Sequence, residues 1–229
     1  MLRLLEHYSS PQGEGPRVGI MSQFVRFAGC NLRCEGWPCD TQHAIQPKLF
    51  AKEQRLVAIP QMVEELFEEH RRTGAANVVF TGGEPLLQNH DDLCKVIDIS
   101  EGMFTFEMFT NGTQAIHPYL AQCCNFVVDW KLAGSGEDAY DKERIANLDR
   151  LDKDTNSFKF TILNRQDLLA AHAVYEEFLK ERRAQVFAGS VWDKYSNVAI
   201  VDYIKEHQLP WRLNVQVHNY VFGAQKRFT

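Results

Sequence analysis

The stretch CNLRCEGWPCDT (residues 30–41) places three cysteines directly after the apolar run FVRFAG (residues 24–29). These residues, Cys30, Cys34 and Cys39, have the spacing C-x3-C-x4-C. A disulfide, a zinc site and an iron–sulfur cluster all use cysteine. Three cysteines fit neither the pair that a disulfide joins nor the four ligands of a structural zinc site. Three thiolates suit a [4Fe–4S] cluster in which one iron stays open to a ligand from outside the chain.

Zinc is the alternative metal for this stretch. A structural zinc site takes four protein ligands, usually arranged as two pairs, and no second cysteine pair follows nearby. His43, four residues past Cys39, is the candidate for a fourth ligand. A zinc-bound, non-catalytic module therefore stays open beside the iron–sulfur interpretation.

The composition is that of an ordinary globular protein. The 229 residues are 45% hydrophobic and 24% charged, without low-complexity segments or repeats, which predicts one domain over residues 1–229. The net charge of −5 argues against binding to nucleic acid or to an acidic membrane surface. The N-terminus, MLRLLEHYSS, lacks the apolar core of a signal peptide, and no apolar segment is long enough to span a bilayer. We expect a cytoplasmic protein with no nucleic-acid or membrane partner.

The remaining three cysteines are Cys94, Cys123 and Cys124. Thiols stay reduced in the cytosol, so structural disulfides are not expected. These residues occur in apolar or helical contexts, and we interpret them as small buried hydrophobic side chains.

The hydrophobic pattern alternates between strand-like and helix-like segments. Strands are predicted at residues 22–27, 77–80, 104–109, 126–129, 157–162, 185–188 and 212–217. Helices are predicted at residues 59–72, 91–100, 167–183 and 198–207, the first of them ended by Gly74. Repeated βα units imply right-handed crossovers and a mostly parallel sheet, in either a doubly wound fold or a partial barrel.

In such folds the functional residues lie on loops at the C-terminal ends of the strands. The segment TGGEP (residues 81–85) follows a predicted strand in this position. Its glycines permit close approach of the backbone to a ligand and leave N–H and C=O groups available. Glu84 supplies an anionic acceptor suited to an ammonium group. The alternative is a tight strand-to-helix turn, with Pro85 at the first position of the helix.

Four segments give the chain a resemblance to radical S-adenosylmethionine enzymes, and more narrowly to the 7-carboxy-7-deazaguanine synthases of 7-deazapurine (queuosine-type) biosynthesis. They are PQGEG (residues 11–15), FVRFAGCNLRC…CDT (24–41), TGGEPLLQ (81–88) and RLNVQVHNYVFGAQKR (212–227). QGEG and the Q-x-H of the last segment narrow the resemblance to the synthases. It implies an α/β fold, a partial (β/α)6-type TIM-like barrel that modifies the radical S-adenosylmethionine core.

The resemblance also implies the chemistry. The family converts 6-carboxy-5,6,7,8-tetrahydropterin to 7-carboxy-7-deazaguanine with loss of ammonia, through a 5′-deoxyadenosyl radical made by reductive cleavage of S-adenosylmethionine. The three cysteines of the opening stretch would hold the [4Fe–4S] cluster. The residues that would hold S-adenosylmethionine are Gly82, Gly83, Glu84, Asp129, Trp130 and Lys131, together with the loop at residues 188–193.

The residues implied for the substrate are Pro11, Gln12, Gly13, Glu14, Arg26, Thr81 and His218. Arg26 would pair with the substrate carboxylate, because a guanidinium offers two parallel donors that a lysine lacks. Thr41 would be a ligand of Mg2+, an ion that prefers oxygen ligands and keeps several waters. Asp40 is the alternative ligand, unless its side chain caps the following turn.

The resemblance implies two partners as well, a flavodoxin-type or ferredoxin-type reductant and a second copy of the chain in a homodimer. The family's commonest cysteine spacing is C-x3-C-x2-C, so this chain has a wider gap after Cys34. We expect residues 36–38 to bulge outward while the three sulfurs keep their mutual geometry. Another small radical enzyme, such as a glycyl-radical activase, is the alternative enzyme class.

Overall fold

The computed structural model describes residues 1–36, 39, 41–100 and 102–223. Its strands are β1 (Leu2–Pro11), β2 (Met21–Phe27), β3 (Arg55–Val57), β4 (Asn77–Gly82), β5 (Thr105–Thr110), β6 (Cys124–Trp130), β7 (Ser157–Ile162), β8 (Gln185–Ser190) and β9 (Arg212–Leu213). Its α-helices are α1 (Gln42–Ile45), α2 (Pro47–Phe50), α3 (Ile59–Thr73), α4 (His90–Ile99), α5 (Pro118–Cys123), α6 (Asp141–Leu151), α7 (Arg165–Val174), α8 (Asn197–Glu206) and α9 (Val217–Phe222).

The described strands form one sheet in the order β3-β1-β2-β4-β5-β6-β7-β8-β9. From β2 to β8 each strand is parallel to its neighbour and follows it in the chain, whereas β1 pairs antiparallel with β2 and with β3. A doubly wound sheet would reverse its strand order at a switch point. The six parallel strands β2 and β4 to β8 therefore confirm the partial (β/α)6 barrel.

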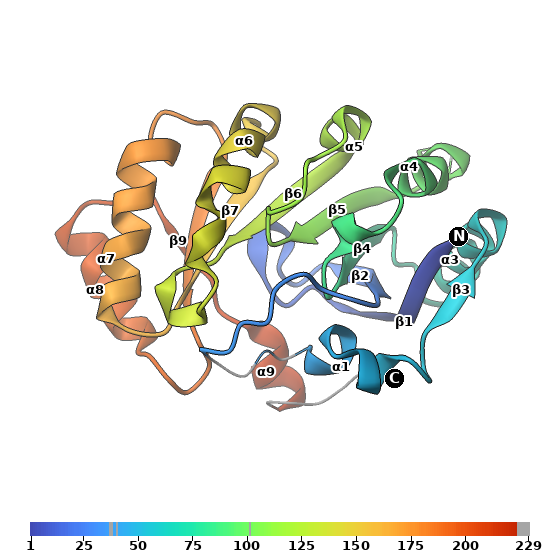
Figure 1. Cartoon of the computed structure of the whole chain (residues 1–229), viewed down its shortest axis with the longest axis horizontal. Helices are drawn as coiled ribbons and strands as arrows, with labels where there is room; N and C mark the ends of the chain where they lie inside the picture. The colour runs from blue at the N-terminus through green and yellow to red at the C-terminus, as the bar shows by residue number, and fades with distance from the viewer. Residues whose placement is uncertain (37–38, 40, 101, 224–229) are drawn as a thin grey trace.

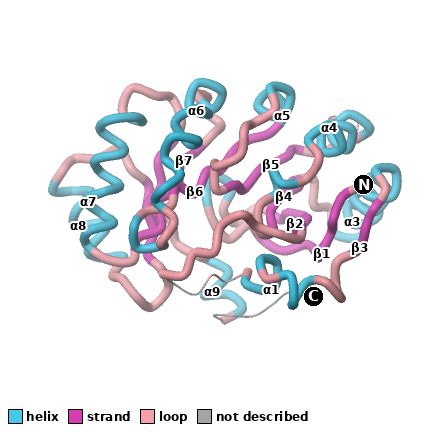
Figure 2. Tube along the Cα trace, in the orientation of Figure 1, coloured by secondary structure: helices cyan, strands magenta, loops and turns pink. Residues whose placement is uncertain are grey.

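Helices α3 to α8 lie around the outside of the arc of strands, and α1 and α9 lie on the other side (Figure 1). The tube view shows the same arrangement, with strands inside and helices outside (Figure 2). Within the described part of the chain, no helix has both the length and the apolar character needed to cross a membrane.

The strands present an apolar face to the helices and a polar face to the inside of the arc. On β7, Phe158 and Phe160 belong to the main hydrophobic core, so strand alternation turns Lys159 and Thr161 to the other face. The same alternation turns further polar residues inward, namely Arg26 of β2, Thr81 of β4, Glu107 of β5 and Asp129 of β6. The inside of the arc is thus lined with hydrogen-bonding and charged groups.

The predicted elements at residues 22–27, 59–72, 77–80, 91–100, 104–109, 126–129, 157–162, 185–188 and 198–207 all occur, with ends shifted by a few residues. Gly74 ends α3 in the left-handed conformation, with φ of 74°. The prediction of a strand over 212–217 was wrong beyond Leu213, because Val217 begins α9. The helix predicted over 167–183 is also shorter, since α7 passes into a π-helical turn (Tyr175–Leu179) and stops there.

The strands β1 and β3 and the helices α1, α2, α6 and α9 were not predicted, and no residue bounds were predicted for α5. The regular alternation of β1 is broken by a register shift between Leu4 and Glu6, which obscures its period in the sequence. Among the isolated cysteines, Cys94 and Cys124 are buried as predicted. Cys123, at the end of α5, is exposed, so the prediction of burial was wrong there.

Arg144 of α6 ties together the loops that follow β5 and β6. Its side chain is fully buried. Its guanidinium donates to the backbone carbonyls of Asn111 (3.1 Å), Glu137 (3.2 Å) and Lys131 (3.4 Å), and to the carboxylate of Asp141 (3.2 Å). Because these carbonyls follow β5 and β6, the single side chain fixes the loops at the C-terminal ends of two adjacent strands.

We expect Arg144→Met to lower the free energy of unfolding by about 3 kcal/mol, because it leaves several buried carbonyl groups without donors. Equilibrium urea unfolding followed by circular dichroism measures the change. Arg71→Met is the control: Arg71 forms an exposed pair with Glu64, and its loss should cost less than about 0.5 kcal/mol. Equal effects of the two substitutions would contradict the role given to Arg144.

Candidate functional site

The cysteine loop (residues 28–41) joins β2 to α1 at the C-terminal edge of the parallel strands. Burial, with a smaller contribution from the nearby thiol of Cys39, raises the pKa of Cys30 to about 11 and that of Cys34 to about 12. The three sulfurs therefore lie within electrostatic range of one another. Buried, adjacent thiols resist deprotonation unless a cation compensates their charge, which is what iron would do. This donor set fits a cluster.

The zinc alternative fits less well. Among the described residues, no three His, Cys, Asp or Glu side chains are arranged to hold a single metal ion. In a cluster each cysteine binds a different iron, so its ligands need not converge on one point. His43, the candidate fourth zinc ligand, faces Glu6 of β1, with 3.3 Å between Nε2 and the carboxylate. The geometry therefore gives no support to a zinc module.

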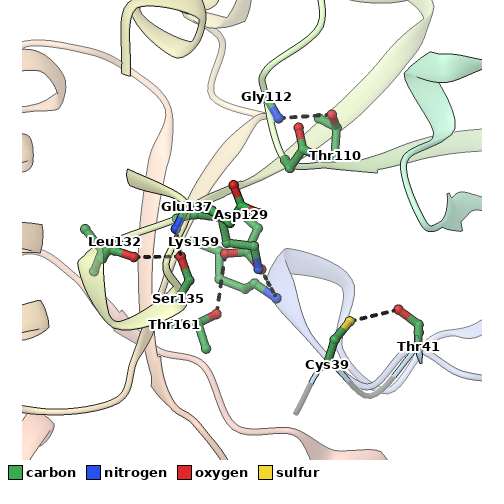
Figure 3. A network of polar contacts seen from close by, with 12 residues as sticks. Cys39, Thr41, Thr110, Gly112, Asp129, Leu132, Ser135, Glu137, Lys159 and Thr161 are labelled. Atoms are coloured by element: carbon green, nitrogen blue, oxygen red, sulfur yellow. Dashed lines mark hydrogen bonds and ion pairs between the residues drawn. The ribbon is translucent and has the colours of Figure 1, made fainter. Parts of the chain in front are cut away.

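The loop after β6 anchors the cysteine loop. The backbone N–H groups of Arg33 and Cys34 donate to the carboxylate of Glu137, at 2.5 and 3.3 Å. The N–H of Gly36 donates to the carbonyl of Ser135 (3.1 Å), and Ser135 Oγ in turn accepts from the N–H of Glu137, as Figure 3 shows. Cys34, at φ of 44°, is thus held in a left-handed conformation by a neighbouring loop.

The two glycines of TGGEP are required by a close approach of two backbones. A Cβ at Gly82, which has φ of 135°, would lie 2.2 Å from the carbonyl oxygen of Phe27. A Cβ at Gly83 would lie 2.1 Å from that of Gly29. The N–H groups of Gly83 and Glu84 donate to these same two carbonyls, at 3.1 and 2.8 Å. Those N–H groups therefore hold the cysteine loop, contrary to the expectation that they stay available.

The carboxylate of Glu84 is fully buried and joins two loops. It accepts hydrogen bonds from the N–H groups of Leu86 (3.0 Å) and Asn111 (2.8 Å) and from the hydroxyl of Thr110 (2.7 Å). Burial raises the pKa of Glu84 to about 7, although these donors act to lower it. The carboxylate thus links the loop after β4 to the loop after β5.

The segment at residues 129–131 divides between two faces of the sheet. The side chain of Trp130 is buried in the main core, stacks on Phe178 and donates from Nε1 to Asp141 (2.9 Å). It therefore faces away from the inside of the arc, where Asp129 lies. Lys131 also reaches the inner side, because its ammonium pairs with Asp129 at 2.8 Å. Of the three residues, Trp130 could touch S-adenosylmethionine only through its backbone.

Asp129 belongs to a network of charges inside the arc. Its Oδ2 lies 2.8 Å from Lys131 Nζ and 3.3 Å from Lys159 Nζ, and its Oδ1 accepts from Thr161 at 3.4 Å. Lys159 Nζ also lies 2.7 Å from the carboxylate of Glu14. Burial acts to raise the pKa of Asp129, but the two ammonium groups outweigh it and lower that pKa to about 2. Figure 3 shows Asp129, Lys159 and Thr161 directed toward one another.

The QGEG loop (residues 12–15) is hydrogen-bonded to the C-terminal segment (residues 214–218). Gln216 Nε2 donates to Glu14 (2.7 Å), the N–H of Val217 to the carbonyl of Gly13 (3.0 Å), and the N–H of Gly15 to Asn214 Oδ1 (3.0 Å). His218 packs directly on Gly13, where a Cβ would lie 2.2 Å from its Nδ1. The two motifs that narrowed the family resemblance are therefore joined in space.

The buried carboxylate of Glu107 orients the side chain of Gln12. Its Nε2 donates to Glu107 at 3.4 Å, and its Oε1 accepts from the N–H of Glu14 at 3.4 Å. Asn77 donates to the same Glu107 oxygen at 2.7 Å, while the other oxygen, Oε1, has no hydrogen-bond partner among the described residues. Burial raises the pKa of Glu107, more than these two donors lower it.

Arg26 is paired within the protein. Its Nε donates to Glu6 (2.8 Å) and its Nη2 to the hydroxyl of Tyr8 (3.1 Å), both on β1. Thr81 is its register partner on β4, so the two side chains share the inner face. Pro11 ends β1 opposite Met21, beside the QGEG loop. Arg26 is therefore a paired strand arginine in this structure, and its place on the inner face is also compatible with binding a substrate carboxylate.

Thr41 is adjacent to the cysteine loop's last thiol, with 3.3 Å between its Oγ1 and Cys39 Sγ, as Figure 3 shows. Asp40, the alternative magnesium ligand, lies outside the described residues, and so do the middle and end of the predicted bulge, Trp37 and Pro38. In the segment 188–193, Gly189 packs against the carbonyl of Asn214, where a Cβ would lie 2.1 Å away.

Several residues of the site were not predicted from the sequence, namely Glu107, Glu137, Arg144 and Lys159. Two of them carried a signal: Lys159 and Glu107 are single charges inside the apolar strands SFKFTI and FTFEMF. A charge within a buried strand requires a partner or a function. Glu137 and Arg144 lie in polar segments, so the sequence does not distinguish them from the exposed charged residues around them.

Known proteins are similar to this chain in sequence and in fold. The family described as "4Fe-4S single cluster domain" matches residues 11–151. The chain is 30% identical to the 7-carboxy-7-deazaguanine synthase of Clostridium acetobutylicum, with 98% of both chains covered, and 49% identical to that of Hyperthermus butylicus, over 49% of this chain and 43% of that one.

A solved structure agrees in fold. QueE from Escherichia coli superposes with a TM-score of 0.72 at 20% sequence identity, covering 95% of this chain and 94% of the other. The structural match supports the fold of this chain, and the sequence matches identify its family. With a relative at 30% identity over nearly its whole length and a cluster-binding domain over more than half of it, the chain belongs to the family of 7-carboxy-7-deazaguanine synthases.

Proposed function

We propose that this chain is a radical S-adenosylmethionine lyase, a single domain that converts 6-carboxy-5,6,7,8-tetrahydropterin to 7-carboxy-7-deazaguanine with loss of ammonia. The observation that carries the proposal is the hydrogen bond between Gln216 of the C-terminal Q-x-H segment and Glu14 of the QGEG loop, which are 202 positions apart in the sequence. Glu14 also pairs with Lys159, on the inner face of β7. A glycyl-radical activase gives no reason for this pairing.

Cys30, Cys34 and Cys39 would hold the [4Fe–4S] cluster, and the segments 82–84 and 129–131 would hold S-adenosylmethionine. When bound, this pair would supply the radical chemistry needed to activate a C–H bond of the pterin. The chain itself binds and orients the substrate and excludes water from it. Thr41 would contribute an oxygen to Mg2+, a flavodoxin or ferredoxin would reduce the cluster, and two copies of the chain would form a homodimer.

The substrate side is built from the QGEG loop and the polar inner face. The pterin is planar, with donors on its pyrimidine ring and a carboxylate on the other ring. Glu14 and Gln12 are acceptors beside which a donor edge can lie, and Arg26 faces the same interior from β2, where it pairs with Glu6 of β1. A guanidinium has five N–H donors, so it can hold Glu6 and a substrate carboxylate together.

An anaerobic turnover assay tests the activity. Reconstituted protein, a reductant, S-adenosylmethionine and carboxytetrahydropterin should yield 7-carboxy-7-deazaguanine, detected by chromatography and mass spectrometry. Cleavage of S-adenosylmethionine without formation of a deazapurine would leave the radical chemistry in place and reject the substrate.

Replacing any one of Cys30, Cys34 and Cys39 by serine should reduce the iron content and the visible absorbance of anaerobically reconstituted protein by most of the wild-type value, because three thiolates hold the cluster. Iron analysis and the absorbance spectrum measure this. Cys123→Ser removes an exposed thiol elsewhere and should leave both unchanged. Wild-type protein that carries zinc and no iron would reject the proposal.

Arg26→Lys should raise the KM for carboxytetrahydropterin about tenfold, because lysine cannot form the two parallel hydrogen bonds of a guanidinium with a carboxylate. The affinity for S-adenosylmethionine should stay within about twofold of wild type, since that ligand lies on other loops. Steady-state kinetics gives the first value and isothermal titration the second. A loss confined to S-adenosylmethionine binding would show that Arg26 serves the other ligand.

We further propose that the side chain of Glu84 organises its loop and does not pair with the ammonium of S-adenosylmethionine, because Leu86, Thr110 and Asn111 already donate to it. Its raised pKa gives a test. In the folded state the carboxyl binds its proton up to about pH 7, against an ordinary value of 4.5, so the folded state holds more protons between these values and stability falls as pH rises through them.

Cluster-free wild-type protein should therefore lose roughly 2 to 3 kcal/mol of unfolding free energy, relative to Glu84→Gln, between pH 5 and pH 8. Urea unfolding at several pH values measures the difference. Parallel curves for the two proteins would show that the carboxyl is ionised without penalty and contradict the proposed role.

A further inference from the structure

Lys159 is the member of the inner charge network that touches both sides of the site. It comes from the middle of β7 and is 9% exposed. Its Nζ lies 2.7 Å from Glu14, on the QGEG loop, and 3.3 Å from Asp129, at the end of β6. The first carboxylate belongs to the substrate side and the second to the cofactor side of the proposed reaction.

Each of these carboxylates also has an anchor of its own. Glu14 accepts from Gln216 of the C-terminal segment at 2.7 Å. Asp129 accepts from Lys131 at 2.8 Å and from Thr161 at 3.4 Å. Lys159 is therefore the link between two groups that are otherwise held by different segments of the chain.

The charges inside the network balance, since two carboxylates face two ammonium groups. Burial acts to raise the pKa of Glu14, but the ammonium of Lys159, with hydrogen bonds from it and from Gln216, lowers it overall. Without Lys159, Glu14 would lose the ammonium 2.7 Å from its carboxylate and keep the hydrogen bond from Gln216, while Asp129 would keep Lys131. A buried charge that loses its partner moves or takes up a proton. Glu14 would then no longer be held as an ionised acceptor at a fixed place.

We propose that Lys159 is a positioning residue that fixes the Glu14 carboxylate, and with it the QGEG loop, against Asp129, and so sets the affinity for a ligand that presents an N–H donor edge to that loop. This inference rests on the proposed function for the identity of the ligand. Its structural part, the holding of the loop by Lys159, does not.

The structural part is tested by hydrogen–deuterium exchange on the reconstituted enzyme without substrate. In Lys159→Met, which keeps an unbranched side chain one atom shorter and removes the charge, the backbone amides of residues 12–15 should exchange about fivefold faster or more. Lys180→Met is the matched control: its pair with Glu176 is also 2.7 Å long but exposed, so exchange at residues 12–15 should not change. Unchanged exchange in Lys159→Met would overturn the inference.

The ligand part is tested by a double-mutant cycle on the Kd of carboxytetrahydropterin, with Lys159→Met, Glu14→Gln and the double variant. Each single change should raise Kd about tenfold, and the double variant should be about as weak as either single one, because Lys159 acts through Glu14. About hundredfold weakening in the double variant would mean independent roles and overturn the inference. The double variant, which removes both charges, also serves if Lys159→Met alone folds poorly.

The two proposals fail in different ways. If the wild-type enzyme binds no carboxytetrahydropterin, the proposed function is rejected, while the exchange measurement still decides the role of Lys159. If the wild-type enzyme binds and turns over the pterin, but the cycle is additive and the exchange unchanged, only the inference about Lys159 is rejected.

Discussion

The close approach of two backbones, at Gly82–Gly83 and at Phe27–Gly29, is the constraint on which the site depends. Side chains at the two glycines would overlap carbonyl oxygens of the cysteine loop, at 2.2 and 2.1 Å. The approach allows two hydrogen bonds that fix the start of that loop on the neighbouring strand. Because the cysteines begin directly after Gly29, their position relative to the barrel is set by this contact.

Other contacts extend this constraint around the barrel rim. Glu84 links the loop after β4 to the loop after β5, through its hydrogen bond with Asn111. Arg144 links the loop after β5 to the loop after β6. The loop after β6 returns to the cysteine loop through Glu137. The rim is thus a ring of loops joined by buried hydrogen bonds, several of them to charged groups, which are stronger than those between neutral partners. Such a rim holds cysteines in place before any cluster binds.

Part of this could be predicted from the sequence. Strand and helix periodicity is local, so the segments 59–72 and 157–162 were recognisable, and the parallel order followed from repeated βα units. The ends were less certain, and β1 was missed because its alternation is interrupted. In the site, the cysteines, TGGEP and QGEG were visible as motifs. Lys159 and Glu107 were visible only as single charges within apolar strands. Arg144 gave no signal, because its role depends on three carbonyls in the loops after β5 and β6.

The sequence by itself determined the cysteine loop, the glycine turn that must lie near it and the family of the chain, because these depend on residue types at short, fixed spacings. Tertiary structure alone decided which face each side chain takes and which distant groups meet. It placed Trp130 in the core and Asp129 inside the barrel, paired Arg26 with Glu6, and brought Gln216 to Glu14. The physical reason is that buried charges must find partners, and only the folded sheet determines which partners are within reach.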